Sequence, residues 1–175
     1  MTCTPDRVSV RAARIGDISE ITEIYGYYVS HTPISFEIEP TSISAMARRF
    51  EDIVAANAPY LVAECDGRVI GFAYARPYKA RAVYQHTIEH SAYLAHSATE
   101  RGVGRLLLDR LIEACVAAGF MEMVATIAGD DNHASMRLHV QCGFIFVGKL
   151  KNVGLKNGCW LDVTLLQRSL RRPHA

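Results

Sequence analysis

HTIEHSAYLAHSATERGVGRLLLDRLIEAC, residues 86–115, joins an apolar strand to an amphipathic helix through a short loop. A strand is predicted over 88–95 because bulky, strand-favouring residues recur there, interrupted by two titratable side chains, Glu89 and His90. The helix is predicted to end at Gly119, since glycine readily closes a helix. Its apolar face consists of Leu107, Leu108, Leu111, Ile112 and Cys115. We expect a ligand site where the strand and the helix meet.

Two glycines, Gly102 and Gly104, lie in the loop at the start of this helix. Without β-carbons they let a phosphate approach the main chain at the positive end of the helix, where the first N–H groups have no helical partner. No third glycine follows at the Rossmann spacing, and no Lys-Ser or Lys-Thr pair follows as in a P-loop. On these residues alone, an anion site and a simple turn are both open.

Length and composition indicate one domain with one core. The chain has 175 residues, of which 50% are hydrophobic, and needs no second domain. We expect an ordered core over residues 8–168 and a frayed tail over 169–175. The 19 basic residues nearly cancel the 18 acidic ones and form no dense stripe, so nucleic acid is not expected as a partner.

The cysteines are scattered and include no C-x-x-C pair: Cys3, Cys65, Cys115, Cys142 and Cys159. This pattern argues against a disulfide framework and a zinc site, so reduced thiols are expected. No histidine has convincing metal-ligand spacing, and no metal is implied. Because no apolar run approaches the ~20 residues of a membrane span and the N-terminus lacks a signal-peptide core, we expect a soluble, cytoplasmic protein without membrane contact.

Apolar periodicity and turn residues predict the other elements. Strands are predicted over 8–13, 60–64, 69–75, 122–127, 144–150 and 160–167. Helices are predicted over 17–30, from Ser42 or Ser44 to 56, and over 132–142. The turn at 65–68 and the Asn157-Gly158 turn indicate hairpins, whereas 31–41 and 76–84 are predicted to be irregular. This order implies an α/β (mixed α+β) fold with one mixed sheet and helices on both of its faces.

Two motifs identify a family. One is the loop pattern Q/R-x-x-G-x-G/A, here Thr99-Glu100-Arg101-Gly102-Val103-Gly104. The other is the helix pattern N-x-x-x-x-x-L-Y-x-x-x-G-F, here from Asn132 through Leu138 and His139 to Gly143 and Phe144. With them the chain resembles the GCN5-related N-acetyltransferases (GNAT) over essentially its whole length. The resemblance implies a single GNAT-type domain over residues 1–175, with a mostly antiparallel, twisted sheet of about seven strands, about four helices, and acetyl-CoA as co-substrate.

Further residues narrow the resemblance. They are Pro77-Tyr78-Lys79-Ala80-Arg81 with Tyr84, Thr87, Glu89 and Tyr93, then Phe36 and Glu39-Pro40, and finally Gly158-Cys159-Trp160-Leu161-Asp162-Val163. They are similar to the phosphinothricin and methionine sulfoximine acetyltransferases. This implies direct acetyl transfer, in a ternary complex, to the α-amine of a small amino-acid analogue such as phosphinothricin, methionine sulfoximine or methionine sulfone. It also implies a homodimer, to which the two closing strands with Trp160 could contribute.

The chain departs from the superfamily pattern at two positions. Thr99 stands where Gln or Arg is usual, so the usual side-chain contact to the pyrophosphate is not expected from this residue, although Arg101 and Arg105 lie near enough in sequence to replace it. His139 stands where Tyr is usual. The phosphinothricin group also has His at that position, so the second departure supports the narrower resemblance.

Glu89 is the candidate general base. An alkylammonium must lose a proton before it attacks a thioester, directly or through one water. A carboxylate in an apolar strand beside the cofactor loop is placed for this, and the resemblance puts the catalytic carboxylate there. The alternative is a structural ion pair with Lys79 or Arg81. The second catalytic candidate is His139, which the resemblance implies as a proton donor to the thiolate or as an orienting group.

The resemblance also implies the residues that bind the cofactor and the substrate. Backbone of Ala92, Tyr93 and Leu94 would hold the pantetheine arm and polarise the acetyl carbonyl. Residues Glu100, Arg101, Gly102, Val103, Gly104 and Arg105 would cradle the pyrophosphate, and Asn132, two helical turns before His139, would orient cofactor or substrate. The acidic groups of the substrate would meet Lys79, Arg81 and Tyr84. Phe36 and Glu39 would form the other wall, with His90 as a further contact and Glu37 exposed.

Two rival functions stay open at this point. One keeps the fold and changes the acceptor to a protein N-terminus, a polyamine or an antibiotic. The other is a CoA-binding sensor without catalysis, which the Thr99 departure leaves open. A covalent cysteine intermediate is not expected, because no cysteine lies between the strand and the helix.

Overall fold

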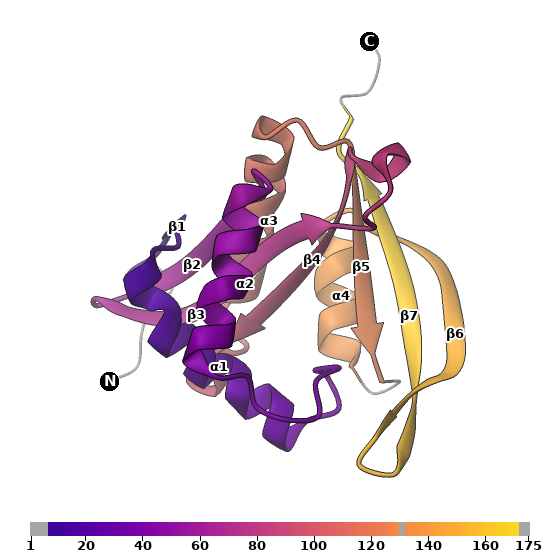
Figure 1. Cartoon of the computed structure of the whole chain (residues 1–175), viewed down its shortest axis with the longest axis horizontal. Coiled ribbons are helices and arrows are strands. Elements are labelled where there is room, and N and C mark those ends of the chain that lie inside the picture. Colours follow the sequence, from indigo (N-terminus) through magenta and orange to yellow (C-terminus); the bar gives the residue numbers. More distant parts are fainter. Residues whose placement is uncertain (1–6, 130–131, 172–175) are drawn as a thin grey trace.

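One seven-stranded sheet organises the chain, in the order β1-β2-β3-β4-β5-β7-β6 (Figure 1). The computed structural model describes residues 7–129 and 132–171. The strands are β1 Val8–Ala12, β2 Tyr60–Cys65, β3 Arg68–Pro77, β4 Thr87–Leu94, β5 Glu122–Ala128, β6 Ile145–Lys156 and β7 Cys159–Ser169. The helices are α1 Ile18–His31, α2 Ile43–Ala55, α3 Val103–Ala117 and α4 His133–Gln141. The β4–β5 pair is parallel and the other pairs are antiparallel, which confirms the predicted sheet class.

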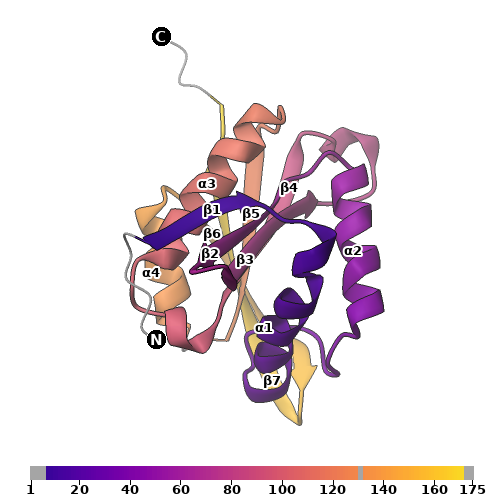
Figure 2. The same ribbon diagram turned by 90° about the vertical axis from the view of Figure 1, so that its left-hand side faces the viewer.

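Helices cover both faces of the sheet (Figure 2). Helices α1 and α2 lie on one face, where Tyr25 of α1 contacts Tyr93 of β4 with ring centroids 5.1 Å apart. Helices α3 and α4 lie on the other, where His139 of α4 contacts His90 of β4. Because side chains alternate along a strand, odd-numbered residues of β4 face α1 and α2, and even-numbered residues face α3 and α4.

Helix α3 anchors the core as its periodicity predicts. Its apolar stripe is fully buried at Leu107, Leu108 and Leu111. The helix packs across β1, β2, β3 and β4. It ends at Ala117, and Gly119 follows with φ +87°, the left-handed conformation expected of a glycine that closes a helix. Packing on three fully buried leucines fixes the start of α3 against the end of β4.

Two predictions need correction. The strand predicted over 144–150 continues to Lys156, because two irregularities in the β6–β7 pairing let the strand resume before the Asn157-Gly158 turn. Among the described cysteines, Cys115, Cys142 and Cys159 are free, but Cys65 is disulfide-bonded, so the expectation of reduced thiols throughout is wrong at Cys65. Cys3 lies outside the described residues.

Neither a membrane-spanning helix nor a metal cluster is found in residues 7–129 and 132–171. No helix there is long and apolar enough to cross a membrane. No three His, Cys, Asp or Glu residues there gather as metal ligands would.

Candidate active site

Strands β4 and β5 separate part-way along their length. Their parallel pairing runs from Thr87 opposite Glu122 to His90 opposite Ala125, where the register ends. Beyond this point the two strands diverge (Figure 1). The last four residues of β4, Ser91 to Leu94, therefore have one edge that faces a split in the sheet instead of a neighbouring strand.

The hydrogen-bond pattern shows which main-chain groups face this split. Ala95 N–H donates to Ile70 O at 2.8 Å, and Tyr78 N–H donates to Thr87 O at 3.1 Å, so odd-numbered residues of β4 bond to β3. In an antiparallel ladder such residues alternate with residues that bond to the other side. The main chain of Ala92 and Leu94 therefore points into the split, whereas that of Tyr93 points to β3. The Leu94 carbonyl accepts a hydrogen bond from Tyr28 Oη at 2.8 Å.

The glycine-bearing loop leads from the open end of β4 into α3. Gly102 precedes the helix with φ +77° and Glu100 has φ +61°, so the chain makes a tight left-handed turn there. No side chain caps the helix, which leaves its first N–H groups open to an anion. Gly104 packs closely, since a β-carbon there would meet Leu138 at 3.4 Å and Leu94 at 3.5 Å. Its role is close packing, while that of Gly102 is conformational.

Two side chains near this loop, those of Thr99 and Arg105, have partners of their own. Thr99 Oγ1 donates to His96 O at 2.9 Å, so the residue that departs from the family pattern tightens the turn before the loop. Arg105 forms an exposed ion pair with Asp109, one helical turn further on, at 3.6 Å. An anion bound here would meet main-chain donors first, with Arg105 as the nearest cation of α3 in sequence.

Asn132 and His139 stand at the two ends of α4. Asn132 caps the helix, because its Oδ1 accepts the Ser135 N–H at 3.3 Å. His139 is 6% exposed, and its Nδ1 lies 2.7 Å from Ser135 O. Its Nε2 lies 3.0 Å from Nε2 of His90, which is also 6% exposed. The two imidazoles form a buried pair on the α4 side of the sheet, at the residue where the pairing of β4 and β5 ends.

These distances define the protonation of the pair. A carbonyl only accepts, so His139 carries its proton on Nδ1 and offers an Nε2 lone pair to the Nε2–H of His90. His90 Nδ1 is then a buried acceptor without a partner among the described residues. Burial, reinforced by the neighbouring His139, lowers the pKa of His90 to about 3, and burial lowers the pKa of His139 as well. Both rings are neutral at pH 7.

Glu89 lies on the opposite face of the sheet from this pair. Arg76 of β3 donates to Glu89 Oε2 through Nη2 at 2.8 Å and Nε at 3.2 Å. Thr126 Oγ1 of β5 donates to Glu89 Oε1 at 2.5 Å. The ion-pair partner of Glu89 is thus Arg76, not Lys79 or Arg81. Thr126 lies one residue beyond the last paired residue of β5, so its hydrogen bond spans the two strands where they begin to separate.

The substrate residues expected from the sequence do not gather in one place. Lys79 Nζ lies 4.9 Å from the ring centroid of Tyr78 and 5.4 Å from that of Tyr84, and Arg81 is exposed. This segment enters β4, whereas Phe36 lies in the loop that follows α1. Figure 1 shows the two segments at opposite ends of the sheet. His90 faces α4 and Phe144, away from Glu89.

The loop between α1 and α2 carries a cluster that the sequence did not indicate. Glu37, expected to be exposed, is half-buried and accepts hydrogen bonds from Thr41 and Arg49. Burial raises the pKa of Glu37, but these hydrogen bonds outweigh burial and lower it overall. The Arg49 guanidinium also lies 5.4 Å from the ring centroid of Tyr25. Lys156 of β6 reaches the same loop and donates to Thr32 O and Ser35 O, each at 2.9 Å.

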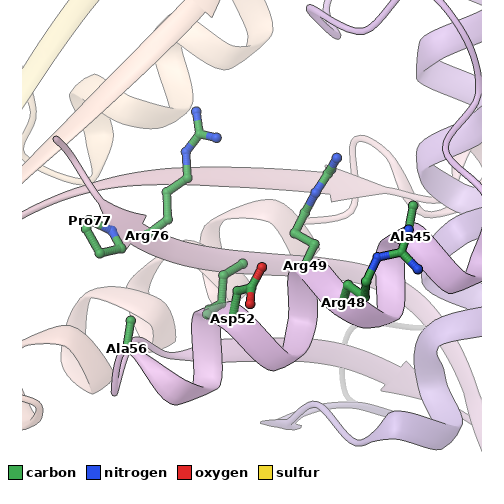
Figure 3. A pocket seen from close by; sticks show the side chains of 8 residues that line it. Ala45, Arg48, Arg49, Asp52, Ala56, Arg76 and Pro77 are labelled. Atoms are coloured by element: carbon green, nitrogen blue, oxygen red, sulfur yellow. The ribbon is translucent and has the colours of Figure 1, made fainter. Parts of the chain in front are cut away.

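An open cavity of about 570 Å³ lies between α2 and the end of β3 (Figure 3). Its charged lining residues are Arg48, Arg49, Asp52 and Arg76. In Figure 3 the side chains of Arg49 and Arg76 rise in the same direction from the two elements. Since Arg76 is bonded to Glu89, the cavity adjoins the candidate base.

Sequence reasoning missed Arg49, Arg76, Thr126 and Lys156. The sequence offers one signal for Arg76. If the strand predicted over 69–75 is extended by one residue, Arg76 becomes part of the strand that pairs with β4. Its pairing with Glu89 depends on the register of β3 and β4, which only the fold defines. Arg49 and Thr126 lie within elements that were predicted, but nothing in their spacing marks them as neighbours of Glu89.

Comparisons with known proteins agree with this geometry. A family model described as an acetyltransferase (GNAT) domain matches residues 10–165. A phosphinothricin N-acetyltransferase from Alcaligenes faecalis is 42% identical over 162 residues, 93% of this chain and 82% of that protein. The L-methionine sulfoximine/L-methionine sulfone acetyltransferase of Salmonella typhimurium is 34% identical over 163 residues, 93% of this chain and 95% of that protein.

A solved structure that contains acetyl-CoA shares the fold of this chain. It is the crystal structure of a GNAT superfamily phosphinothricin acetyltransferase from Sinorhizobium meliloti in complex with acetyl-CoA. The two chains align with a TM-score of 0.89 at 38% identity, over 93% of this chain and 88% of that one. The family match, the split sheet and the open start of α3 lead to one conclusion. The chain belongs to the GNAT acetyltransferase family and is an enzyme that uses acetyl-CoA as its co-substrate.

Proposed function

We propose that this acetyltransferase acetylates the α-amine of a small amino-acid analogue, such as phosphinothricin, methionine sulfoximine or methionine sulfone, by direct attack in a ternary complex. The observation that carries the proposal is the position of Glu89 at the start of the β4–β5 split, held on both oxygens by Arg76 and Thr126. Two relatives that act on such compounds, by their names, cover 93% of the chain.

The residues present fit acetyl-CoA. The open start of α3, with Gly102 and Gly104, supplies main-chain donors for the pyrophosphate, so Thr99 is not required as a side-chain ligand. The main chain of Ala92 and Leu94 lines the split, where the extended pantetheine arm can add to the free edge of β4. Bound acetyl-CoA supplies the acetyl group as a thioester. The roles proposed for Glu100 and Arg101 follow from their place in this loop, and those for Val103 and Arg105 from their place in the first turn of α3.

The proton of the incoming ammonium passes to Glu89, directly or through one water, before the amine attacks. The main-chain N–H groups that face the split are suited to stabilise the oxyanion that attack creates. His139 fits the orienting role better than the proton-donor role. Its Nδ1–H is bonded to Ser135 O, and its Nε2 already accepts from His90, so a neutral His139 has no proton to give to the thiolate.

The acceptor contacts proposed from the resemblance, at Phe36, Lys79, Arg81, Tyr84 and His90, stay predictions. Lys79 and Tyr84 pack on each other at the entrance to β4, and Phe36 is exposed. A second copy of the chain is also proposed, because the long outer strand β6 exposes apolar side chains on the sheet edge.

A thiol-release assay with acetyl-CoA tests the proposal. Phosphinothricin, methionine sulfoximine and methionine sulfone should be acetylated, and polyamines and peptide N-termini should not. Glu89→Gln should lower kcat by roughly 100- to 10,000-fold, the usual contribution of a general base, and leave acetyl-CoA binding by calorimetry intact. Glu113→Gln, the same change at an exposed site of α3, should act as wild type.

Each outcome of this assay separates the candidate functions. Thiol release with none of the amino-acid analogues, but with a peptide or polyamine, would move the protein to another acceptor class. Acetyl-CoA binding without thiol release to any acceptor would support the sensor. Unchanged turnover in Glu89→Gln would remove Glu89 from the mechanism.

A further inference from the structure

Two guanidinium groups stand on the Glu89 face of the sheet, and each is tied to its own carboxylate. Arg76 is bonded to Glu89 at 2.8 Å, and Arg49 is bonded to Glu37. They come from different elements, β3 and α2, yet line one cavity (Figure 3). Arg49 lies over Tyr25, whose ring in turn contacts Tyr93 of β4. Arg49 therefore lies above the same side of β4 from which Glu89 projects.

The guanidinium groups of Arg49 and Arg76 interact electrostatically. Burial and, to a smaller extent, the neighbouring charge of Arg49 lower the pKa of Arg76. The Coulomb attraction and hydrogen bonds of Glu89, together with a contribution from Tyr74, outweigh them and raise the pKa overall. Two guanidinium groups that line one cavity favour an anion between them, although each already has one carboxylate partner. A guanidinium keeps several N–H donors, so Arg49 can retain Glu37 and still receive a second anion.

We propose that Arg49 is a specificity-determining residue that, with Arg76, binds the acidic group of the acceptor and so selects carboxylate-bearing amines. This subsite rests on the proposed function and adds to it the chemical class that the site selects. An anion shared by Arg49 and Arg76 holds the acceptor beside Glu89, so its amine meets the base. The exposed segment Lys79–Tyr84 is not needed for this recognition.

Kinetics with matched acceptors test the subsite. The probes are methionine sulfone and 3-(methylsulfonyl)propylamine, the same amine without its carboxylate. Wild type should strongly prefer methionine sulfone. Arg49→Gln should lower kcat/KM for methionine sulfone roughly 10- to 100-fold, the loss expected for a charge-assisted hydrogen bond, and should change the carboxylate-free amine less than about threefold. Arg49→Lys, which keeps the charge, should recover part of the loss.

Two further variants separate anion binding from a structural role. Glu37→Gln removes the partner of Arg49 but keeps its charge, so the preference for methionine sulfone should persist. Arg110→Gln removes one charge from an exposed ion pair on α3 and should leave both acceptors unchanged. An equal loss with both acceptors in Arg49→Gln, or the same loss in Glu37→Gln, would overturn the subsite. Wild-type enzyme that acetylates both probes equally would also overturn the subsite, but it would leave the proposed acetyl transfer intact. If neither probe nor phosphinothricin gives thiol release, the proposed function itself is overturned.

Discussion

The buried His90–His139 pair makes folding sensitive to acid. In the unfolded chain a histidine titrates near its ordinary value of ~6.5, whereas the pKa of His90 in the folded protein is about 3. Below pH 6.5 the unfolded state therefore binds a proton that the folded state does not. Stability from this site is fully present above pH 6.5 and is lost progressively as the pH falls toward 3. The lowered pKa of His139 acts in the same direction.

We expect the free energy of unfolding, measured in urea between pH 7 and pH 5, to fall with decreasing pH in the wild type. His90→Gln cannot titrate but still offers an N–H to His139, so its slope against pH should be shallower. His86→Gln, the same change at an exposed position, should keep the wild-type slope. Equal slopes for His90→Gln and the wild type would show that His90 is not a buried neutral imidazole.

The pair also shows what could be predicted for single residues. Glu89 and His139 are predicted as site residues, because the chemistry of acetyl transfer needs a base and the resemblance implies a role for both. Their separation onto opposite faces of the sheet follows from alternation along β4, but only once α4 is known to lie on the side of His90. Contacts across the sheet, such as Arg76 with Glu89, depend on register and were missed.

At the scale of elements, the β6–β7 hairpin holds the loop that follows α1. Lys156 is 5% exposed and donates to Thr32 O and Ser35 O, at the other end of the sequence. Burial lowers the pKa of its ammonium, which the charge of Glu37 partly restores. The two carbonyls compensate for the lost hydration, and the loop that carries Glu37, the partner of Arg49, is fixed as a result.

Lys156→Met removes both hydrogen bonds and leaves two carbonyls without their donor. We expect the free energy of unfolding to fall by about 1–3 kcal/mol, the usual cost of an unsatisfied buried polar group, and KM for the acceptor to rise while KM for acetyl-CoA is unchanged. Lys151→Met, an exposed lysine on the same strand, is the control and should change neither. Wild-type stability and KM in Lys156→Met would show that the hairpin does not hold the loop.

The elements themselves were largely predictable, and the exceptions have physical causes. Strong periodicity set α3 and the hairpin of β2 and β3. The end of β6 was missed because its pairing with β7 shifts twice, so the alternation on which strand prediction depends is broken between Leu150 and Gly154. The role of Lys156 could not be predicted for the same reason, since it lies in the part of β6 beyond the strand predicted over 144–150.

For the whole molecule, the two edges of the sheet differ. Strand β1 has five residues and β6 has twelve, and each is paired on one side only. Long exposed edges with apolar side chains invite pairing with another chain. The exposed apolar residues on and beside this edge are Ile145, Phe146, Val147, Leu150, Val153, Leu155 and Trp160. A second copy of the chain, meeting β6 against β6, would cover them.

Light scattering after size exclusion should therefore give a mass of two 19.4 kDa chains for the wild type. Phe146 is 61% exposed, so Phe146→Lys should leave the fold intact and place a desolvated charge in the interface, shifting the protein to one chain. Val116→Lys makes the same kind of change at an exposed apolar residue of α3 and should leave the dimer unchanged. A wild type of single-chain mass, or a Phe146→Lys variant that stays paired, would place the interface elsewhere or remove it.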